Sequence, residues 1–303
     1  MIQLGSTLRV FHPAPNVLAF YDGRIEGQRA YSTHPNWLDD GAYTLGICSF
    51  AIVNGKSALV YDTHISLPHA RAIRTKLEAM GIREIRVVLS HWHDDHVAGN
   101  EVFADCEILA HRLTAEILTE RRTMLESGDP PIKPLVLPNR TWEGQMELEV
   151  GCLRIELRHA DIHSRDGTVL YLPAQGLLFA GDTLEDPVTY VDEPDRLGVH
   201  LENLRIMENW KENWALPRIL PNHGAPEKIA AGGYPASLVG ATRRYVDKLL
   251  RCPGDEGLAS QDLRTFAGDD FACGAITYFP PYEEVHRGNV KAVCATSIGS
   301  ERS

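Results

Sequence analysis

The chain has 303 residues, of which 44% are hydrophobic and 23% charged, and its formal net charge is −11. This is the composition of a globular protein with one large domain or two small ones. The acidic charge argues against nucleic acid as the main partner, because phosphates require a basic surface, and the absence of any apolar run near 18 residues argues against a membrane span.

The six cysteines are scattered along the chain and form no Cys-x-x-Cys pair. The N-terminus lacks the basic segment followed by an apolar segment that marks a secretory signal. We therefore expect reduced thiols and a cytoplasmic location.

The first 90 residues predict a hairpin, a helix and a strand. Residues 1–40 mix aromatic residues with Gly and Pro and show no clean period. A hairpin is predicted over residues 43–63, because Asn54-Gly55 supplies the positive φ angles of a tight turn between two apolar runs. A helix is predicted from Pro68 to Gly81, with apolar residues three or four apart on one face. The β-branched run over residues 84–89 predicts a buried strand.

The rest of the chain continues to alternate between strand and helix patterns, and residues 252–303 give the weakest signals. The predicted elements are a strand at 107–110, a helix at 112–126, an irregular Pro-rich connection at 130–138, two strands within 147–159, a hairpin over 168–180, a helix through Leu201 to Trp214, a strand at 218–220 and a helix at 237–251.

Residues 91–96 read His-Trp-His-Asp-Asp-His, directly after the predicted buried strand. Neutral imidazole and carboxylate are ligands that suit zinc, iron and related divalent ions. Gly99 permits a sharp turn just beyond the motif, and α/β sheets usually place their sites at the C-terminal ends of strands. This segment therefore predicts a metal-binding turn.

Three later segments extend the pattern: Ala-Asp-Ile-His-Ser at 160–164, Phe-Ala-Gly-Asp-Thr at 179–183 and Leu-Pro-Asn-His-Gly at 220–224. Together with residues 91–96, and in the same order, they resemble the metal-binding signature of the metallo-β-lactamase superfamily. The resemblance covers about residues 40–230. The combination of four segments is highly specific for the superfamily and weakly specific for substrate.

The resemblance implies an α/β (α+β) fold: an αββα sandwich of two mixed β-sheets flanked by helices. Patterning alone gives only a mixed α/β protein. We expect residues 1–303 to form a single metallo-β-lactamase-like domain, with a core over about 40–235 and a C-terminal extension over about 236–303.

The resemblance also implies a ligand set for two metal ions. It assigns His91, His93 and His163 to one ion, Asp95, His96 and His223 to the other, and Asp182 to both. Independently, seven nitrogen and oxygen ligands are more than one tetrahedral ion needs. The expected ions are two divalent cations, Zn²⁺ first; iron, manganese or cobalt could replace zinc, because the two carboxylates make the site harder than a thiolate site.

Some assignments have competitors. Asp94 adjoins Asp95 and is the ligand if the register slips by one, although the motif spacing favours Asp95. His159 lies near His163 and competes with it. Asp62, at the end of a predicted strand, either contacts a ligand histidine or only terminates the strand.

Aromatic residues around the motif raise a similar choice. Tyr190 either donates its hydroxyl to a developing oxyanion or only packs. Four aromatic side chains are candidates for pocket walls, with ordinary packing as the alternative: Phe20, Tyr21, Trp37 and Trp92.

The expected function is that of a metal-dependent hydrolase. A metal-bridging hydroxide, available at neutral pH because a divalent ion lowers the pKa of water, would open a small carbonyl substrate, with Asp95, Asp182 and Tyr190 as catalytic residues. A lactone or carboxylic ester is favoured, because the zinc β-lactamases of the family often carry cysteine at the position of Asp182. Homodimerisation is left open.

Four other functions stay open: a thioesterase of glyoxalase-II type, a β-lactamase-like hydrolase, a phosphodiesterase and a di-iron redox protein. The redox relatives typically carry glutamate in place of one motif histidine, whereas position 93 here is histidine. The acidic net charge weighs against the phosphodiesterase.

Overall fold

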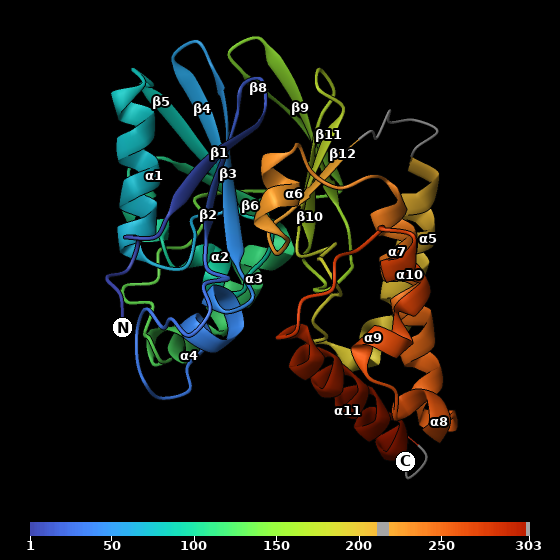
Figure 1. Cartoon of the computed structure of the whole chain (residues 1–303). Helices are drawn as coiled ribbons and strands as arrows, with labels where there is room; N and C mark the ends of the chain where they lie inside the picture. The colour runs from blue at the N-terminus through green and yellow to red at the C-terminus, as the bar shows by residue number, and fades with distance from the viewer. Residues whose placement is uncertain (211–217, 301–303) are drawn as a thin grey trace.

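The computed structural model describes residues 1–210 and 218–300. Two β-sheets lie side by side in the middle of the molecule, with α1 outside the first sheet and α5 and α7 outside the second (Figure 1). The first sheet has the order β1-β2-β3-β4-β5-β6-β7 and the second β12-β11-β10-β9-β8. Each sheet contains antiparallel and parallel pairs. The expected αββα sandwich of two mixed sheets is thus confirmed.

The strands have the following bounds. In the first sheet they are β1 (Arg9–Ala14), β2 (Val17–Asp22), β3 (Ile47–Asn54), β4 (Ser57–Tyr61), β5 (Glu84–Val88), β6 (Glu107–His111) and β7 (Arg140–Trp142). In the second sheet they are β8 (Gln145–Val150), β9 (Leu153–His159), β10 (Thr168–Leu172), β11 (Leu177–Gly181) and β12 (Arg218–Pro221).

The helices cover the outer faces of the sheets and the end of the molecule that carries the metal-binding motif (Figure 1). They are α1 (Leu67–Ala79), α2 (Asp94–Val97), α3 (Arg112–Glu120), α4 (Arg122–Glu126), α5 (Leu197–Asn209), α6 (Pro226–Ala230), α7 (Ser237–Arg251), α8 (Glu256–Ala259), α9 (Leu263–Phe266), α10 (Gly268–Ala272) and α11 (Tyr282–Ser300), with a π-helical turn η1 (Trp37–Tyr43) and short 3₁₀ turns η2 (Asn100–Phe103), η3 (Pro194–Arg196) and η5 (Cys252–Gly254).

Local sequence signals explain the confirmed elements. The hairpin β3–β4 pairs Asn54 with Ser57, and Gly55 takes a φ of 62° in its turn. Pro68 lies in the first turn of α1, where its missing N–H costs no hydrogen bond. Gly81 follows that helix with a φ of 83°.

Other segments differ from the predictions. Residues 1–40, which show no clean period in the sequence, contain β1 and β2. Every residue of β2 is buried, so this strand lacks the alternation of a half-exposed strand. The helix predicted over 112–126 is divided at Arg121, whose φ and ψ are −91° and 7°. Residues 252–303, weak in the sequence, contain four helices within the described part. Trp214, predicted to lie on a helix, falls outside the described residues.

The main hydrophobic core lies between the two sheets and continues under the C-terminal helices. Phe50 of β3 meets Phe179 of β11 edge to face, with ring centroids 5.3 Å apart. A second core, which includes Ile73 and Leu77, packs α1 against the outer face of the first sheet. The C-terminal helices share the first core, as a single domain would require, although the division of the chain proposed above stays a prediction.

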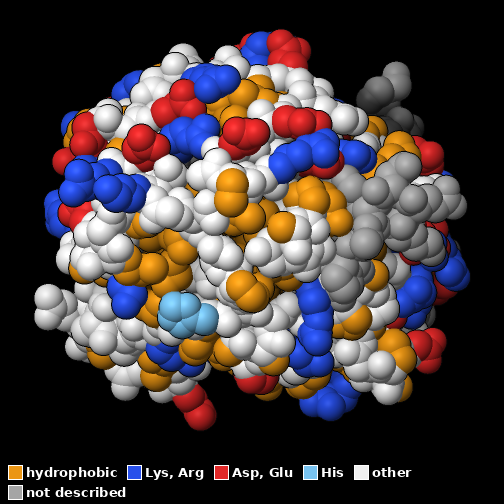
Figure 2. Space-filling model, turned by 90° about the horizontal axis from the view of Figure 1, so that it is seen from above, with side chains coloured by type: hydrophobic (Ala, Val, Ile, Leu, Met, Phe, Trp, Pro, Cys, Tyr) orange, Lys and Arg blue, Asp and Glu red, His pale blue; other side chains and the backbone are white. Residues whose placement is uncertain are grey.

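The face at the top of Figure 1 shows how charge is distributed on one side of the molecule (Figure 2). Lys and Arg side chains alternate there with Asp and Glu side chains and do not gather into a basic stripe.

Among the described residues, no helix has both the length and the apolar character needed to cross a membrane. All six cysteines are unpaired.

Replacing Phe179 with alanine tests the packing between the sheets. We expect a loss of about 3–5 kcal/mol in the free energy of unfolding, because a fully buried ring leaves a cavity between Phe50 and Tyr61. Urea denaturation followed by circular dichroism measures this loss. Val199→Ala, at a 43% exposed position, is the control and should change stability by less than about 0.5 kcal/mol. A loss below about 1 kcal/mol in Phe179→Ala would show that the sheets do not pack as described.

Candidate metal centre

The His-rich motif lies in the turn that follows β5. The strand ends at Val88, His91 and His93 follow in extended loop, and α2 begins at Asp94. The turn lies against the chain after β4, because a Cβ at Gly99 would stand 2.1 Å from the Thr63 carbonyl oxygen. Glycine is therefore required where the motif turns back toward the first sheet.

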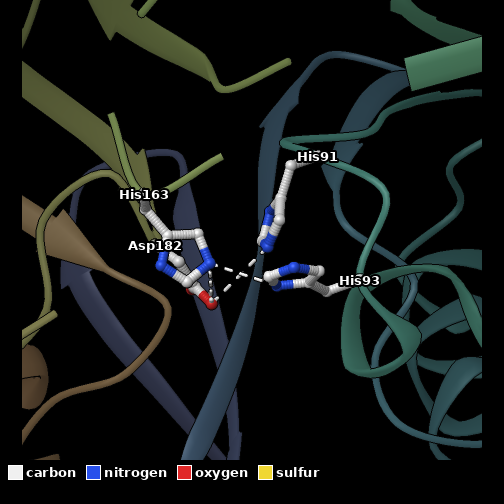
Figure 3. Close-up of side chains that lie close together, drawn as sticks. All are labelled: His91, His93, His163 and Asp182. Carbon is white, nitrogen blue, oxygen red and sulfur yellow. Dashed lines mark hydrogen bonds and ion pairs between the residues drawn. The ribbon is translucent and has the colours of Figure 1, made fainter. Parts of the chain in front are cut away.

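The structure brings all seven predicted ligand residues into two groups of side chains. One group contains His91, His93, His163 and Asp182, and the other contains Asp95, His96, Asp182 and His223. Within each group the ligand atoms all lie within 4.8 Å of one another, so these His and Asp side chains are able to hold metal ions. Figure 3 shows the first group, in which the three imidazoles point toward the Asp182 carboxylate.

The inner atoms of the two groups face one another at short distances. His93 Nδ1 and His163 Nε2 face each other at 3.1 Å, and His223 Nε2 lies 3.1 Å from Asp95 Oδ2. His91 Nε2 and Asp182 Oδ1 are buried without any hydrogen-bond partner in the described residues. Buried polar atoms seldom lack partners, and lone pairs that face each other need a cation between them. The residues therefore fit a metal cluster.

The outer nitrogen of four of the five imidazoles is hydrogen-bonded to an oxygen atom, which fixes the tautomer. The outer nitrogen of His93 lies 3.6 Å from Asp192 Oδ2. His163 Nδ1 donates to the Tyr190 carbonyl at 3.0 Å, and His223 Nδ1 donates to the Gly46 carbonyl at 2.7 Å. His91 Nδ1 donates to Ser90 Oγ at 2.9 Å. A proton held on the outer nitrogen leaves the inner nitrogen as the electron pair that a metal needs.

Asp62 organises the second group from behind. Its Oδ2 accepts from His96 Nδ1 at 2.9 Å, from Ser90 Oγ at 2.6 Å and from Asn222 Nδ2 at 2.6 Å, and its Oδ1 accepts from the Ser90 N–H at 2.6 Å. This fully buried carboxylate thus joins the end of β4 to the segments after β5 and β12. Of the two readings left open for Asp62, contact with a ligand histidine is the one observed.

The electrostatics favour a cation. Burial disfavours the charged form of His96 and His223, but the Asp182 and Asp95 carboxylates outweigh it and raise the pKa of both imidazoles well above the usual range. Burial lowers the pKa of His91 well below its usual range, which keeps it neutral. The carboxylates that attract these protons would equally attract a metal ion, which must displace the protons to bind.

The competing residues lie in different positions relative to the two groups. Asp95 belongs to the second group, whereas Asp94 belongs to neither. His159 stacks on His111 at 4.2 Å and contacts the Arg165 carbonyl with its Nε2, so it lies outside both groups, whereas His163 lies within the first.

A cavity of about 270 Å³ opens onto the two groups. Among the aromatic candidates, Trp37, Trp92 and Tyr190 line it. Phe20 and Tyr21, also expected as walls, do not: Phe20 is buried in the core beneath α1, and the Tyr21 hydroxyl donates to the Gly224 carbonyl at 2.9 Å.

The family model of the metallo-beta-lactamase superfamily matches residues 43–252. The chain belongs to this superfamily. Among solved structures, this chain resembles the DIM-1 metallo-beta-lactamase with a TM-score of 0.59 and 18% identity, over 79% of this chain and 96% of DIM-1. The likeness to TMB-1 has a TM-score of 0.59 and 17% identity, over 80% of this chain and 97% of TMB-1. At these identities the likeness shows the fold alone.

Relatives of known name are similar in sequence. The alpha subunit of 2,4-dinitroanisole O-demethylase from Nocardioides sp. is 30% identical over 53% of this chain and 47% of its own length. The lactamase-like protein ptaB of Pestalotiopsis fici is 27% identical over 72% of this chain and 69% of its own length. Atrochrysone carboxyl ACP thioesterase of Aspergillus terreus is 26% identical over 56% and 48%. The match thus spans about half the length of the first and third relatives. The expectation of an enzyme of this superfamily is confirmed.

Sequence reasoning missed the groups that brace this superfamily site from the C-terminal side. Glu185 Oε1 accepts from the Tyr190 N–H at 2.9 Å and lies 3.4 Å from His163 Nδ1. Asn289 of α11 binds the Thr189 carbonyl at 2.7 Å and the Val191 N–H at 2.9 Å. No motif marks Glu185 or Asn289, and only their spatial neighbours reveal what they do.

Asp62→Asn tests how far the superfamily site depends on its supporting carboxylate. Asparagine tolerates the positive φ of 65° at this position, but it presents an amide where three donors converge. We expect metal affinity to fall about 10- to 100-fold, measured by competition with a chelator. Asp269→Asn, an exposed change in α10, is the control and should leave affinity unchanged. Equal affinity in the two variants would show that Asp62 does not support the ligands.

Proposed function

We propose that this chain is a dinuclear metal-dependent hydrolase that opens a small carbonyl substrate, most readily a lactone or a carboxylic ester. The observation that carries the proposal is the pair of ligand groups that share Asp182 at the floor of one cavity. His91, His93 and His163 would hold the first ion, Asp95, His96 and His223 the second, and Asp182 both. Zn²⁺ is the first choice of metal, with iron, manganese or cobalt as alternatives.

When bound, two such cations lower the pKa of water and polarise a carbonyl oxygen. The side chains supply the geometry for this chemistry. The outer hydrogen bonds of the imidazoles hold the ligands in one orientation, and two indole rings line the cavity. Among the described residues lining this cavity there is no serine or cysteine that could act as a nucleophile, so water is the attacking group.

Tyr190 is proposed to donate its hydroxyl to the oxyanion that forms during attack. Its ring lines the cavity, with its centroid 6.4 Å from that of His163. The hydroxyl makes no hydrogen bond to another described residue, and the side chain is 47% exposed, so the phenol is available to a substrate. Asp95 and Asp182 would contribute as ligands of the metal ions.

The thioester is the second candidate substrate. One relative is named as an ACP thioesterase, and the same arrangement of ligands can serve an ester or a thioester. The ether named in the O-demethylase relative and the β-lactam suggested by the lactamase-like relative complete the set of compounds worth testing.

Hydrolysis of a substrate panel by metal-loaded and chelated protein tests the proposal. We expect turnover of acyl lactones or aryl esters, at least about 100-fold faster with metal than after chelation. Asp182→Ala should lose metal, because both groups share this carboxylate, and its activity should fall by a similar factor; elemental analysis measures the metal content. Absence of turnover on lactones, esters, thioesters and β-lactams by the metal-loaded protein would refute the proposed function.

Tyr190→Phe tests the oxyanion donor. We expect kcat to fall by about 10- to 100-fold with little change in KM, because the lost hydrogen bond forms only in the transition state. Steady-state kinetics on the best ester measures both constants, and metal content serves as the control because the backbone carbonyl that binds His163 is retained. An unchanged kcat would make Tyr190 a packing residue.

A further inference from the structure

The cavity walls carry a charge pattern that the metal ligands do not account for. Besides Asp95 and Asp182, three carboxyl side chains line the cavity: Asp94, Glu185 and Asp192. No lysine or arginine is among the lining residues, all of which belong to the described part of the chain. A substrate that carries its own carboxylate or phosphate would therefore meet carboxyl groups and no basic side chain at the walls, and only the metal ions would attract its charge.

Asp192 stands on the side of the cavity formed by the His-rich turn. Its Oδ2 lies 3.6 Å from His93 Nε2, and its side chain is 27% exposed, so it reaches both the metal centre and the solvent at the cavity mouth. Glu185 lies deeper, fixed by the Tyr190 N–H and by the Tyr282 hydroxyl at 3.3 Å. The acidic wall thus extends from the mouth to the floor.

Two indole rings contribute to the remaining walls, beside Gly41, Ala42 and Tyr190. Trp37 is held by its Nε1, which donates to the Pro130 carbonyl at 2.8 Å. Trp92 is only 5% exposed, and the Arg121 guanidinium stacks on its ring at 4.0 Å from the centroid. Arg121 is engaged on the indole and does not line the cavity. Held in place in this way, the two rings contribute apolar lining that suits an aromatic group.

From this arrangement we infer that the substrate is a small aromatic ester or lactone that bears no anionic group. The inference rests on the proposed hydrolase function and narrows its substrate class. It sets carboxylated lactams, acidic thioesters and phosphodiesters apart as poor substrates, because each would bring a negative charge to the acidic wall.

A matched pair of 4-nitrophenyl benzoates tests the inference: one has a para carboxamide and the other a para carboxylate, so that size and aromatic character are equal. Each rate is divided by the rate of the same ester without enzyme, which removes the electronic effect of the substituent. We expect kcat/KM for the neutral ester to exceed that for the anionic ester by about tenfold or more. Equal values, or a preference for the anion, would overturn the inference while leaving the hydrolase proposal intact.

Asp192→Asn should lower this neutral-to-anionic ratio at least about threefold. Because the readout is a ratio, a general loss of activity does not affect it. Asp195→Asn, which changes an exposed carboxylate outside the cavity, is the matched control and should keep the ratio of the unmodified protein. The same ratio in all three proteins would show that Asp192 sets no selectivity and would overturn the charge argument.

A substitution in the aromatic wall tests the expected preference for an aromatic substrate. Trp37→Leu should raise KM for the neutral benzoate ester more than for 4-nitrophenyl acetate, and equal changes would overturn it. If neither benzoate is turned over, the full substrate panel still decides the hydrolase proposal, and the charge question passes to binding of the corresponding benzamides, neutral and carboxylated, read by quenching of tryptophan fluorescence in the metal-loaded protein. Tighter binding of the neutral amide then supports the inference, and equal binding overturns it.

Discussion

The Asp182 carboxylate is the point on which the whole arrangement depends. It is buried, it belongs to both ligand groups, and it lies at the end of β11, in the second sheet, whereas the His-rich turn follows a strand of the first. A buried carboxylate stays ionised only where positive charge or hydrogen-bond donors surround it. Protonated imidazoles can supply this charge, and so can metal ions. The packing of one sheet against the other therefore has a chemical result, because it closes a cluster that neither sheet contains alone.

This dependence explains which parts of the site could be read in the sequence. Each ligand segment follows a strand or sits in a tight turn, and the residue types reveal the chemistry, so His91 through His96, Asp182 and His223 could be predicted from spacing and resemblance. Asp62 was visible only as a polar residue after a strand. Its four hydrogen bonds come from segments that the sequence separates by 28 to 160 residues, and no local pattern records such distances.

The fold shows the same limit. Hairpin β3–β4 and helix α1 carry turn and capping signals that act over a few residues, and they were predicted. Strand β2 carries none, because burial on both faces removes the alternation that marks a half-exposed strand. Phe20 and Tyr21 on that strand were expected at the cavity for the same reason: an aromatic residue near the N-terminus has no signal that separates a pocket wall from a core.

The hydrogen bonds of Asn289 connect one wall of the cavity to the C-terminal helix α11. The ligands come from turns fixed by the two sheets and by Asp62. The segment with Thr189, Tyr190 and Val191 is instead tethered to α11, near the end of the chain. A shift of the C-terminal helices would therefore move one wall of the opening together with the Tyr190 carbonyl that holds His163, while the other ligands keep their supports. Substitutions in the C-terminal helices could then change which substrates enter the cavity while most of the metal ligands stay the same. These helices are therefore the first place to compare when related chains with the same ligands differ in substrate preference.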